Sequence, residues 1–431
     1  MVKKTIALVL LLGSAFSSFG QSFNKLHRQF DESRILKTYY YGFALFDVEQ
    51  DRIVFGKNEH NYFTPASNTK VFTLYESLTH LGDSLVGLEY IEQGDSLYFW
   101  GTGDPTFLYS KTKTEAVFDF LKNQEKTLVY VPQETQEPIY RAGWGVEDYD
   151  YYYQPEVTPF PIYGNVARFS VLGNAVEAQP SFFTQFVEWK NEEGRMSMNR
   201  DFRENKFIIK GSSSKKHNFT KPFVYSDSLF VALLSDTLNR EVCISHIPKP
   251  FDVKAVYSSH TREVLREMML PSDNFLAEHL QMNMAYKKYN GFFTRDFRAH
   301  MDSLYSTLLP DKIQLRDGSG LSSYNKITPA SMVQLLKHIY EQDTNENEIL
   351  KLFPAGGLEG TLKGVYPLRN GQPFVWAKTG TIHAVHAQSG FMRTKSGKLY
   401  LYSFLNNNYL GSSIPVRNEM VKIMTFLHDN Y

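Results

Sequence analysis

The spacing of apolar residues changes twice along this chain of 431 residues, and the two changes define its domain organisation. Residues 83–254 consist of short alternating segments separated by clusters of Gly, Pro, Ser and Asn, a pattern typical of strands and turns. Residues 21–82 and 255–431 mix helical and strand-like patterns instead. We therefore predict an α/β (α+β) domain built from 21–82 and 255–431, which is discontinuous in sequence and interrupted by an inserted β-rich region at 83–254.

Individual elements can be placed from the spacing within each part. Residues 40–55 alternate and turn at 49–51, which predicts a β-hairpin, and apolar residues at helical spacing after Pro65 predict a helix that Gly82 closes. Further helices are predicted at 261–269, 274–286 and 329–341 and at the C-terminus, and strands in FVWAKTGT, QSGFMRT and KLYLYSFLNN. Inside the inserted region, LYFWGTG, KTLVYVP, ENKFIIKG and SLFVALL are predicted as strands.

Composition excludes several classes of protein. Lys and Arg total 46 and Asp and Glu also total 46, so no net charge draws the chain toward nucleic acid. Aromatic residues make up 15% of the chain, which indicates a packed globular protein rather than a disordered one. Cys243 is the only cysteine, which excludes an intramolecular disulfide and a Cys-rich zinc site.

The first 20 residues have the pattern of a secretory signal. Lys3 and Lys4 precede the apolar run 6–12, and small residues follow before Gln21. The apolar run is much shorter than the roughly 20 residues that a bilayer span needs, and no later segment is long and apolar enough to span. We predict that residues 1–20 are removed and that the mature chain is exported, into the periplasm.

Ser67 and Lys70 lie three residues apart at the start of the predicted helix, so both side chains project from one face. A serine hydroxyl becomes a good nucleophile when a neighbouring lysine with a lowered pKa removes its proton. The same S-x-x-K spacing recurs at Ser110, Ser212 and Ser213, in polar, turn-like sequence where a surface location is sufficient explanation. Position in the fold must decide between them.

Two further motifs follow in the C-terminal part. Ser272-Asp273-Asn274 opens a predicted helix, where a serine is most often only an N-cap, and Lys378-Thr379-Gly380-Thr381 ends an apolar strand-like run. Two other segments also fit S-x-N, 197–199 and 323–325; the helix start favours 272–274 because it fixes the side chain better than a loop does. S-x-x-K, S-D-N and K-T-G in this order form the motif set of penicillin-binding proteins and serine β-lactamases.

With these motifs the chain resembles the D-alanyl-D-alanine carboxypeptidase/endopeptidases among the low-molecular-mass penicillin-binding proteins, in the class with a large insert in the transpeptidase-like domain. Further blocks similar to that family cover essentially the whole mature chain: Gly101–Pro105, Gly143-Trp144 with Asp148, Ala277-Glu278, Asp317–Ser322, Pro354–Gly356 with Gly360–Leu362, and Asn406-Asn407.

The resemblance implies roles for five catalytic residues. Ser67 would be the acylated nucleophile and Lys70 its general base. Lys378 would lower the pKa of Lys70 by like-charge repulsion and attract the terminal carboxylate of the substrate. Ser272 would relay a proton to the leaving D-alanine, and Asn274 would hold Lys70 and the amide on the acyl side.

The resemblance also implies a set of substrate-binding residues. The Thr379 and Thr381 hydroxyls would bind the carboxylate, Gly380 would let the substrate backbone approach, and the N–H groups of Ser67 and Thr381 would form the oxyanion hole. Asp148 and Tyr153 match positions that face the diamino-acid side chain of the peptide stem, with a surface cluster of tyrosines as the alternative.

We therefore expect an exported D-alanyl-D-alanine carboxypeptidase, endopeptidase or both, acting on peptidoglycan peptides, without a metal or another cofactor, and inhibited covalently by β-lactams. A serine β-lactamase or esterase of the same fold is one alternative, weakened because no E-x-x-N-type group for rapid deacylation is evident. An inactive exported scaffold is another. A metal hydrolase is disfavoured because His383 and His386 lack the H-E-x-x-H pattern. Nothing in the sequence assigns an oligomeric state.

Overall fold

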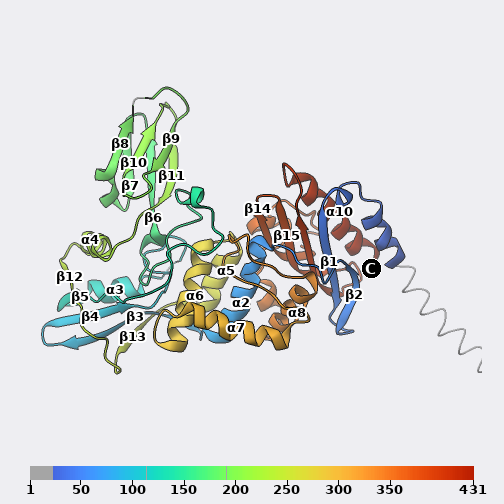
Figure 1. The fold of residues 1–431 in the computed structure, drawn as a ribbon, viewed down its shortest axis with the longest axis horizontal. Coiled ribbons are helices and arrows are strands. Elements are labelled where there is room, and N and C mark those ends of the chain that lie inside the picture. The colour runs from blue at the N-terminus through green and yellow to red at the C-terminus, as the bar shows by residue number, and fades with distance from the viewer. Residues whose placement is uncertain (1–22, 113, 191) are drawn as a thin grey trace, which may run out of the picture.

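The computed structural model describes residues 23–112, 114–190 and 192–431, so the predicted signal at 1–20 lies outside the described residues. The molecule is elongated, with the two ends of the chain gathered at one side and the middle of the chain at the other (Figure 1). None of the helices in the described part of the chain has both the length and the apolar character that a membrane crossing requires.

One antiparallel sheet joins the two ends of the chain. Its strand order is β14-β15-β16-β1-β2, so the N-terminal hairpin pairs with the C-terminal strands, beginning with Tyr40 opposite Asn407. The hairpin predicted at 40–55 and the three C-terminal strands are confirmed. The strands are β1 (Tyr40–Asp47), β2 (Arg52–Lys57), β14 (Val375–Ile382), β15 (Val385–Arg393) and β16 (Leu399–Asn407).

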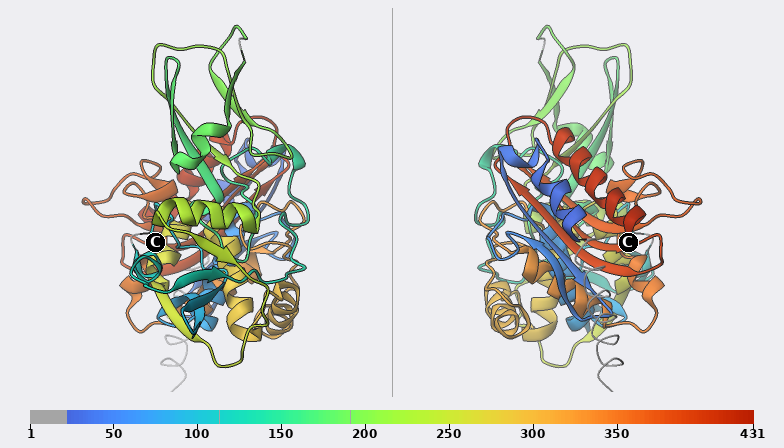
Figure 2. Two further views of the ribbon diagram at one scale, coloured as in Figure 1. Left: turned by 90° about the vertical axis from the view of Figure 1, so that its left-hand side faces the viewer. Right: turned by 90° about the vertical axis from the view of Figure 1, so that its right-hand side faces the viewer.

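Helices cover both faces of this sheet because side chains alternate along its strands. Ala44 and Phe46 of β1 face one core, and Phe43 and Leu45 face the other. The first core contains residues of the helices α2 (Lys70–His80), α5 (Thr261–Met269), α6 (Asn274–Tyr289), α7 (Thr294–Leu308), α8 (Pro329–Tyr340) and α9 (Glu346–Leu350). The short 3-10 turn η2 (Ala66–Thr69) leads into α2 and packs against β14 and β15. The second core lies under α10 (Ile414–Asn430) and a helix over 23–31, which run together on the outer face (Figure 2).

The helix predictions in this part are confirmed, but the periodicity analysis missed three helices: the one over 23–31, the short α9, and α7, which is the longest of the three. Its buried side chains are Phe297, Met301 and Tyr305, which form one narrow stripe at four-residue spacing. Leu304 and Leu308 are partly buried against the same core, so the helix does carry an apolar stripe, with polar residues on its opposite face.

The middle of the chain forms three further sheets. A five-stranded mixed sheet has the order β12-β5-β4-β3-β13, with β3 (Ser84–Gln93), β4 (Ser96–Gly101), β5 (Thr127–Tyr130), β12 (Val242–Ile244) and β13 (Lys254–His260). Two three-stranded sheets project from the body of the molecule (Figure 2), one with β6 (Val166–Leu172), β7 (Ala175–Gln179) and β11 (His217–Pro222), the other with β8 (Val187–Lys190), β9 (Ser197–Arg200) and β10 (Phe207–Lys210). The division of the chain into domains at 82/83 and 254/255 stays a prediction.

Two helices, α3 (Ala116–Lys122) and α4 (Asp227–Leu238), accompany these sheets, and α4 corrects the sequence analysis. The segment SLFVALL, predicted as a strand, lies entirely within α4. The Ser226 hydroxyl caps this helix by accepting the Leu229 N–H at 3.1 Å. Phe230, Leu233 and Leu234 then lie on one buried face at helical spacing, a pattern that a short apolar run does not distinguish from a strand.

Candidate active site

Ser67 and Lys70 lie where η2 runs into α2, in the centre of the helical layer. The Lys70 side chain is fully buried, and its Nζ donates to Ser67 Oγ at 3.2 Å, to Asn274 Oδ1 at 2.6 Å and to the Ser319 carbonyl at 2.6 Å. The loop that carries Ser319 packs tightly here, since a Cβ at Gly320 would lie 1.9 Å from the Ala66 carbonyl. The structure therefore brings two distant segments, at Asn274 and Ser319, onto the amine beside Ser67.

Burial lowers the pKa of Lys70 to about 8, and the nearby carboxylates of Asp317, Asp273 and Glu278 partly oppose that shift. A neutral lysine amine has two N–H donors and one lone pair. The two donors suffice for Asn274 and Ser319, which leaves the lone pair for the Ser67 hydroxyl. The site can therefore activate the serine by general-base catalysis.

Lys378 lies in β14 with its side chain fully buried beside this centre. Its Nζ donates to Ser272 Oγ at 2.7 Å and to the Thr379 carbonyl at 2.7 Å. Burial lowers the Lys378 pKa well below its ordinary value, and repulsion from Lys70 lowers it further. Burial is thus the largest cause of the lowered pKa of both lysines, and the repulsion between their two ammonium groups, which acts on both, adds to it.

The Ser272 hydroxyl does not cap α6. The cap is Asp273, whose Oδ1 accepts the Leu276 N–H at 3.1 Å, and Ser272 stands one residue earlier with a φ of 64°. This left-handed backbone is uncommon for a residue with a side chain and costs conformational energy. It leaves the Ser272 hydroxyl to Lys378, while Asn274 turns toward Lys70.

The asparagines of the two alternative S-x-N segments, 197–199 and 323–325, bond other residues than Lys70. Asn199 Nδ2 donates to Asp150 Oδ2 at 3.1 Å in the middle of the chain. Asn325 Nδ2 donates to Asp317 Oδ1 at 2.6 Å, and Ser323 is exposed. Neither asparagine contacts Lys70, so of the three candidates only 272–274 meets the S-x-x-K pair.

Gly380 allows β14 to run along the backbone of η2. A Cβ at Gly380 would lie 2.6 Å from Ser67 N, 2.8 Å from the Pro65 carbonyl and 2.9 Å from Asn68 N, so no larger residue fits without moving the chain. Asn68 Nδ2 also donates to the Lys378 carbonyl at 3.1 Å. These contacts hold the two lysines in one rigid unit.

The two threonines of the K-T-G-T segment lie on the edge strand of the sheet and are at least partly exposed. Thr379 Oγ1 donates to Thr361 Oγ1 at 2.7 Å, and Thr381 Oγ1 lies 2.8 Å from Nδ1 of His386. Both hydroxyls thus have fixed positions next to Lys378. His386, expected at the edge of the cleft or in a structural role, positions Thr381.

Tyr153 reaches the site through its backbone, because its carbonyl accepts from Asn274 Nδ2 at 2.9 Å. Its hydroxyl bonds the Asp148 carboxylate, and burial together with that carboxylate raises the Tyr153 pKa. Asp150 anchors the same segment by accepting the Arg200 N–H at 2.8 Å and the Lys221 ammonium at 2.6 Å. The structure thus brings both predicted residues of this segment to the margin of the site.

Sequence reasoning assigned no role to the residues that support the Ser319 loop. Glu278 Oε1 accepts the N–H of Gly318 at 3.0 Å and of Ser319 at 2.8 Å, and Arg141 Nε donates to Glu278 Oε2 at 3.2 Å. Asp317 accepts from the Gly320 N–H at 2.9 Å as well as from Asn325. Glu278 and Asp317 lie in the blocks Ala277-Glu278 and Asp317–Ser322, whose resemblance to the family was the one sequence feature that marked them.

Comparisons with known proteins agree with this geometry. The model of the family described as D-Ala-D-Ala carboxypeptidase 3 (S13) matches residues 24–429. The chain is 25% identical over 249 residues to D-alanyl-D-alanine carboxypeptidase DacB of Haemophilus influenzae, a match that covers 53% of this chain and half (50%) of that relative's length. It is 23% identical over 421 residues to the D-alanyl-D-alanine carboxypeptidase of Actinomadura sp. (strain R39), covering 86% of this chain and 78% of the other.

The fold resembles solved structures over almost its whole length. Penicillin binding protein 4 (dacB) from Haemophilus influenzae superposes with a TM-score of 0.75 at 20% identity, covering 94% of this chain and 99% of that one. A structure of that protein complexed with a β-lactam gives a TM-score of 0.69 at 19% identity, with the same coverage of 94% and 99%. Because the family model extends over residues 24–429, the chain belongs to the D-Ala-D-Ala carboxypeptidase 3 (S13) family.

Proposed function

We propose that this protein is a serine-type D-alanyl-D-alanine carboxypeptidase, endopeptidase or both, which cleaves peptidoglycan stem peptides through an acyl-Ser67 intermediate. One observation carries the proposal: the buried Lys70 amine, with its lowered pKa, touches Ser67 Oγ, Asn274 Oδ1 and the Ser319 carbonyl at once. Membership of the family, and relatives named as D-alanyl-D-alanine carboxypeptidases, support the same substrate class.

In the acylation step, Ser67 Oγ attacks the carbonyl carbon of the D-Ala-D-Ala amide as Lys70 takes the hydroxyl proton. The new C–O bond forms, and the C–N bond to the leaving D-alanine breaks. The proton that Lys70 took from Ser67 is returned through the Ser272 hydroxyl, which is bonded to Lys378, to the departing amine, so Lys70 is neutral again before deacylation. The N–H groups of Ser67 and Thr381 hold the oxyanion, a contribution of roughly 3 kcal/mol per donor.

Water then hydrolyses the ester, with Lys70 again accepting a proton, and releases the shortened peptide. The Thr379 and Thr381 hydroxyls, with Lys378 beside them, bind the terminal carboxylate of the substrate. A β-lactam has a carboxylate and a strained amide in the same relation, so it acylates Ser67 and inhibits the enzyme. The β-lactam complex of the Haemophilus penicillin binding protein 4 supports this extension to the present chain. We place the mature protein in the periplasm, where this substrate lies.

The first experiment is intact-mass spectrometry of the protein after incubation with benzylpenicillin, followed by peptide mapping. One penicilloyl adduct on the Ser67 peptide is the expected result. Absence of both adduct and drug consumption would favour an inactive scaffold, whereas rapid drug consumption without an adduct would favour a β-lactamase. Release of D-alanine from a stem pentapeptide and cleavage of cross-linked muropeptides then separate carboxypeptidase from endopeptidase activity.

A further inference from the structure

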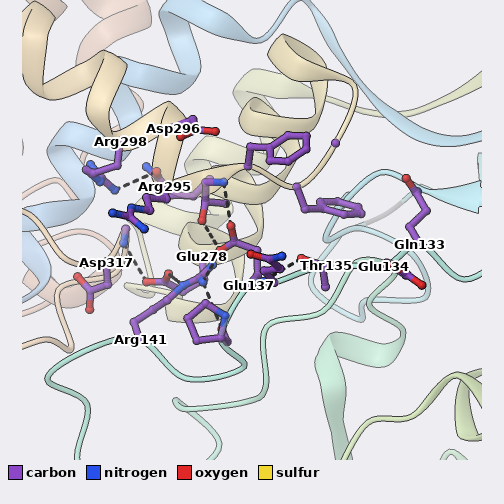
Figure 3. A pocket seen from close by; sticks show the side chains of 18 of the residues that line it. Gln133, Glu134, Thr135, Glu137, Arg141, Glu278, Arg295, Asp296, Arg298 and Asp317 are labelled. Carbon is purple, nitrogen blue, oxygen red and sulfur yellow. Dashed lines mark hydrogen bonds and ion pairs between the residues drawn. The ribbon is translucent and has the colours of Figure 1, made fainter.

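A second cleft opens between the middle of the chain and the helical layer. It encloses about 1200 Å³ and is lined by the extended segment after β5 (132–138), by the start of α7 with the loop before it (290–298), and by 315–318 (Figure 3). Ser67, Lys70 and Lys378 do not line it. Its volume is above the roughly 300–1,000 Å³ of most small-molecule pockets and is large enough for a short peptide.

Two exposed guanidinium groups line this cleft. Arg295 and Arg316 are exposed, and neither guanidinium group makes a hydrogen bond or ion pair with any residue that the structure describes. The Arg316 backbone N–H donates to Asn325 Oδ1 at 2.6 Å, and its guanidinium attracts the Asp302 carboxylate without pairing with it. Arg298, one turn after Arg295 and drawn beside it in Figure 3, is instead bound to Glu76 at 3.2 Å. The planar guanidinium fork matches a carboxylate, so the two exposed guanidinium groups favour an anionic group.

Another wall of the cleft offers an unpaired stretch of backbone. The N–H groups of residues 133–136 donate to no acceptor in the described part of the chain, although Val131 N, just before them, still bonds the Phe99 carbonyl at 3.0 Å. Glu134 on this stretch is exposed and has no ion pair among the described residues. Figure 3 shows Glu134 across the cleft from Arg295. An extended peptide can pair with such an edge through its own backbone.

We propose that this cleft is an exosite for a second stem peptide of the peptidoglycan polymer. Arg295 and Arg316 hold a free carboxylate of that peptide, its backbone runs along residues 133–136, and Glu134 receives an amino group. The inference rests on the proposed function, because peptidoglycan presents many stems on one polymer. A stem held in the cleft raises the local concentration of its neighbours at Ser67, and a soluble single-stem substrate gains nothing from it.

The binding test blocks Ser67 with benzylpenicillin and titrates the acylated protein with the tetrapeptide L-Ala-γ-D-Glu-L-Lys-D-Ala by calorimetry. We expect the acylated protein to bind, and the double variant Arg295→Ala/Arg316→Ala to bind about tenfold or more weakly. The matched control Lys215→Ala/Lys216→Ala removes two exposed cations elsewhere and binds as the parent does. Absence of binding, equal binding by the arginine variant, or equal competition by sodium acetate would each overturn the proposal.

The activity test compares the same variants on two substrates. The arginine variant is expected to release D-alanine from diacetyl-L-Lys-D-Ala-D-Ala and to be acylated by benzylpenicillin at the parent rates, but to act severalfold more slowly on insoluble peptidoglycan. Equal rates on the polymer, with normal acylation, overturn the exosite alone. Absence of acylation at Ser67 in the parent protein is failure of the proposed function, so the two failures are distinguishable.

Discussion

Lys378 Nζ donates to the Ser272 hydroxyl at 2.7 Å. This hydrogen bond connects the K-T-G motif on β14 to a serine in left-handed backbone conformation. Lys70 makes the equivalent connection to Ser67 and Asn274. The site therefore contains two lysine–serine pairs, each with a lysine whose pKa is lowered by burial. The predictions below separate what each pair does.

Replacing the nucleophile tests the first pair. Ser67→Ala is expected to abolish the penicilloyl adduct and leave the thermal unfolding midpoint close to that of the parent, because it removes one hydroxyl without disturbing packing. Intact-mass spectrometry with benzylpenicillin measures the adduct. Ser110→Ala, at an exposed serine with the same S-x-x-K spacing, is the matched control and keeps full labelling. Labelling of the Ser67→Ala protein would refute the assignment.

The lowered pKa of Lys70, about 8, predicts the pH dependence of acylation. Below that value the amine is protonated and cannot accept the serine proton, so the rate rises about tenfold per pH unit and levels off above it. Stopped-flow measurement of the second-order acylation rate between about pH 6 and pH 9 tests this. A flat profile over that range, with unchanged circular dichroism, would show that Lys70 is not the titrating base.

Ser272→Ala tests the second pair. If this hydroxyl passes a proton to the leaving amine, its loss is expected to lower D-alanine release about 10²-fold or more. The variant is measured by steady-state release from a stem pentapeptide. Ser323→Ala changes an exposed serine of a competing S-x-N segment and should leave the rate unchanged. Equal losses in the two variants would assign the effect to general destabilisation.

Asp148→Asn tests whether the Asp148–Tyr153 pair contacts the substrate. If the carboxylate holds the free amino group of the diamino acid, kcat/KM for a peptide with that amine falls about tenfold. The same peptide with the amine acetylated, and benzylpenicillin itself, should react at unchanged rates. An undiminished rate with the free amine would leave the segment as a tyrosine cluster at the surface.

Gly380→Ala tests the close approach of β14 to η2. The added Cβ would meet backbone atoms of Ser67 and Asn68 at 2.6 Å and 2.9 Å, which cannot move independently of the nucleophile. We expect a free energy of unfolding lower by about 1–3 kcal/mol and a large loss of acylation rate.

Gly82→Ala serves as the control for this substitution, because its Cβ would come no closer than 3.6 Å to the flexible end of Lys287. Denaturant unfolding and mass-based labelling report the two effects separately. Parent-like labelling by the Gly380→Ala protein would show that the strand can move away without cost to the site.

The sequence predicts a helix or strand correctly where the spacing of apolar residues agrees with the residues that start or end the element. Pro329 begins α8 with a proline at its first position, and the hairpin around 49–51 has an alternating strand on each side, so both are recovered. The strand prediction for SLFVALL is wrong because a run of seven mostly apolar residues fits a buried helix as well as a buried strand. Only the packing of Phe230 and Leu234 into the core of the middle region decides that it is a helix.

The three motifs and their order along the chain predict which side chains form the site. They do not predict which backbone groups take part in it. The Ser319 carbonyl receives Lys70 although nothing in a serine side chain marks its carbonyl as a partner. Its position depends on Glu278 and Arg141, which are far apart in sequence and meet only in the folded chain. The pKa of Lys378 likewise depends on burial, which spacing does not reveal.

The three acceptors around Lys70 come from three separate segments, with Ser67 on η2, Asn274 on α6 and Ser319 on a loop. Because η2 runs directly into α2, the two segments that must dock are α6 and the Ser319 loop, and a molecule in which either has not docked lacks the proposed base in its working arrangement. Covalent labelling by a β-lactam then counts native molecules in a mixed population. A refolding reaction sampled with a fluorescent penicillin would report when the last segment docks, because partly folded chains would not be labelled.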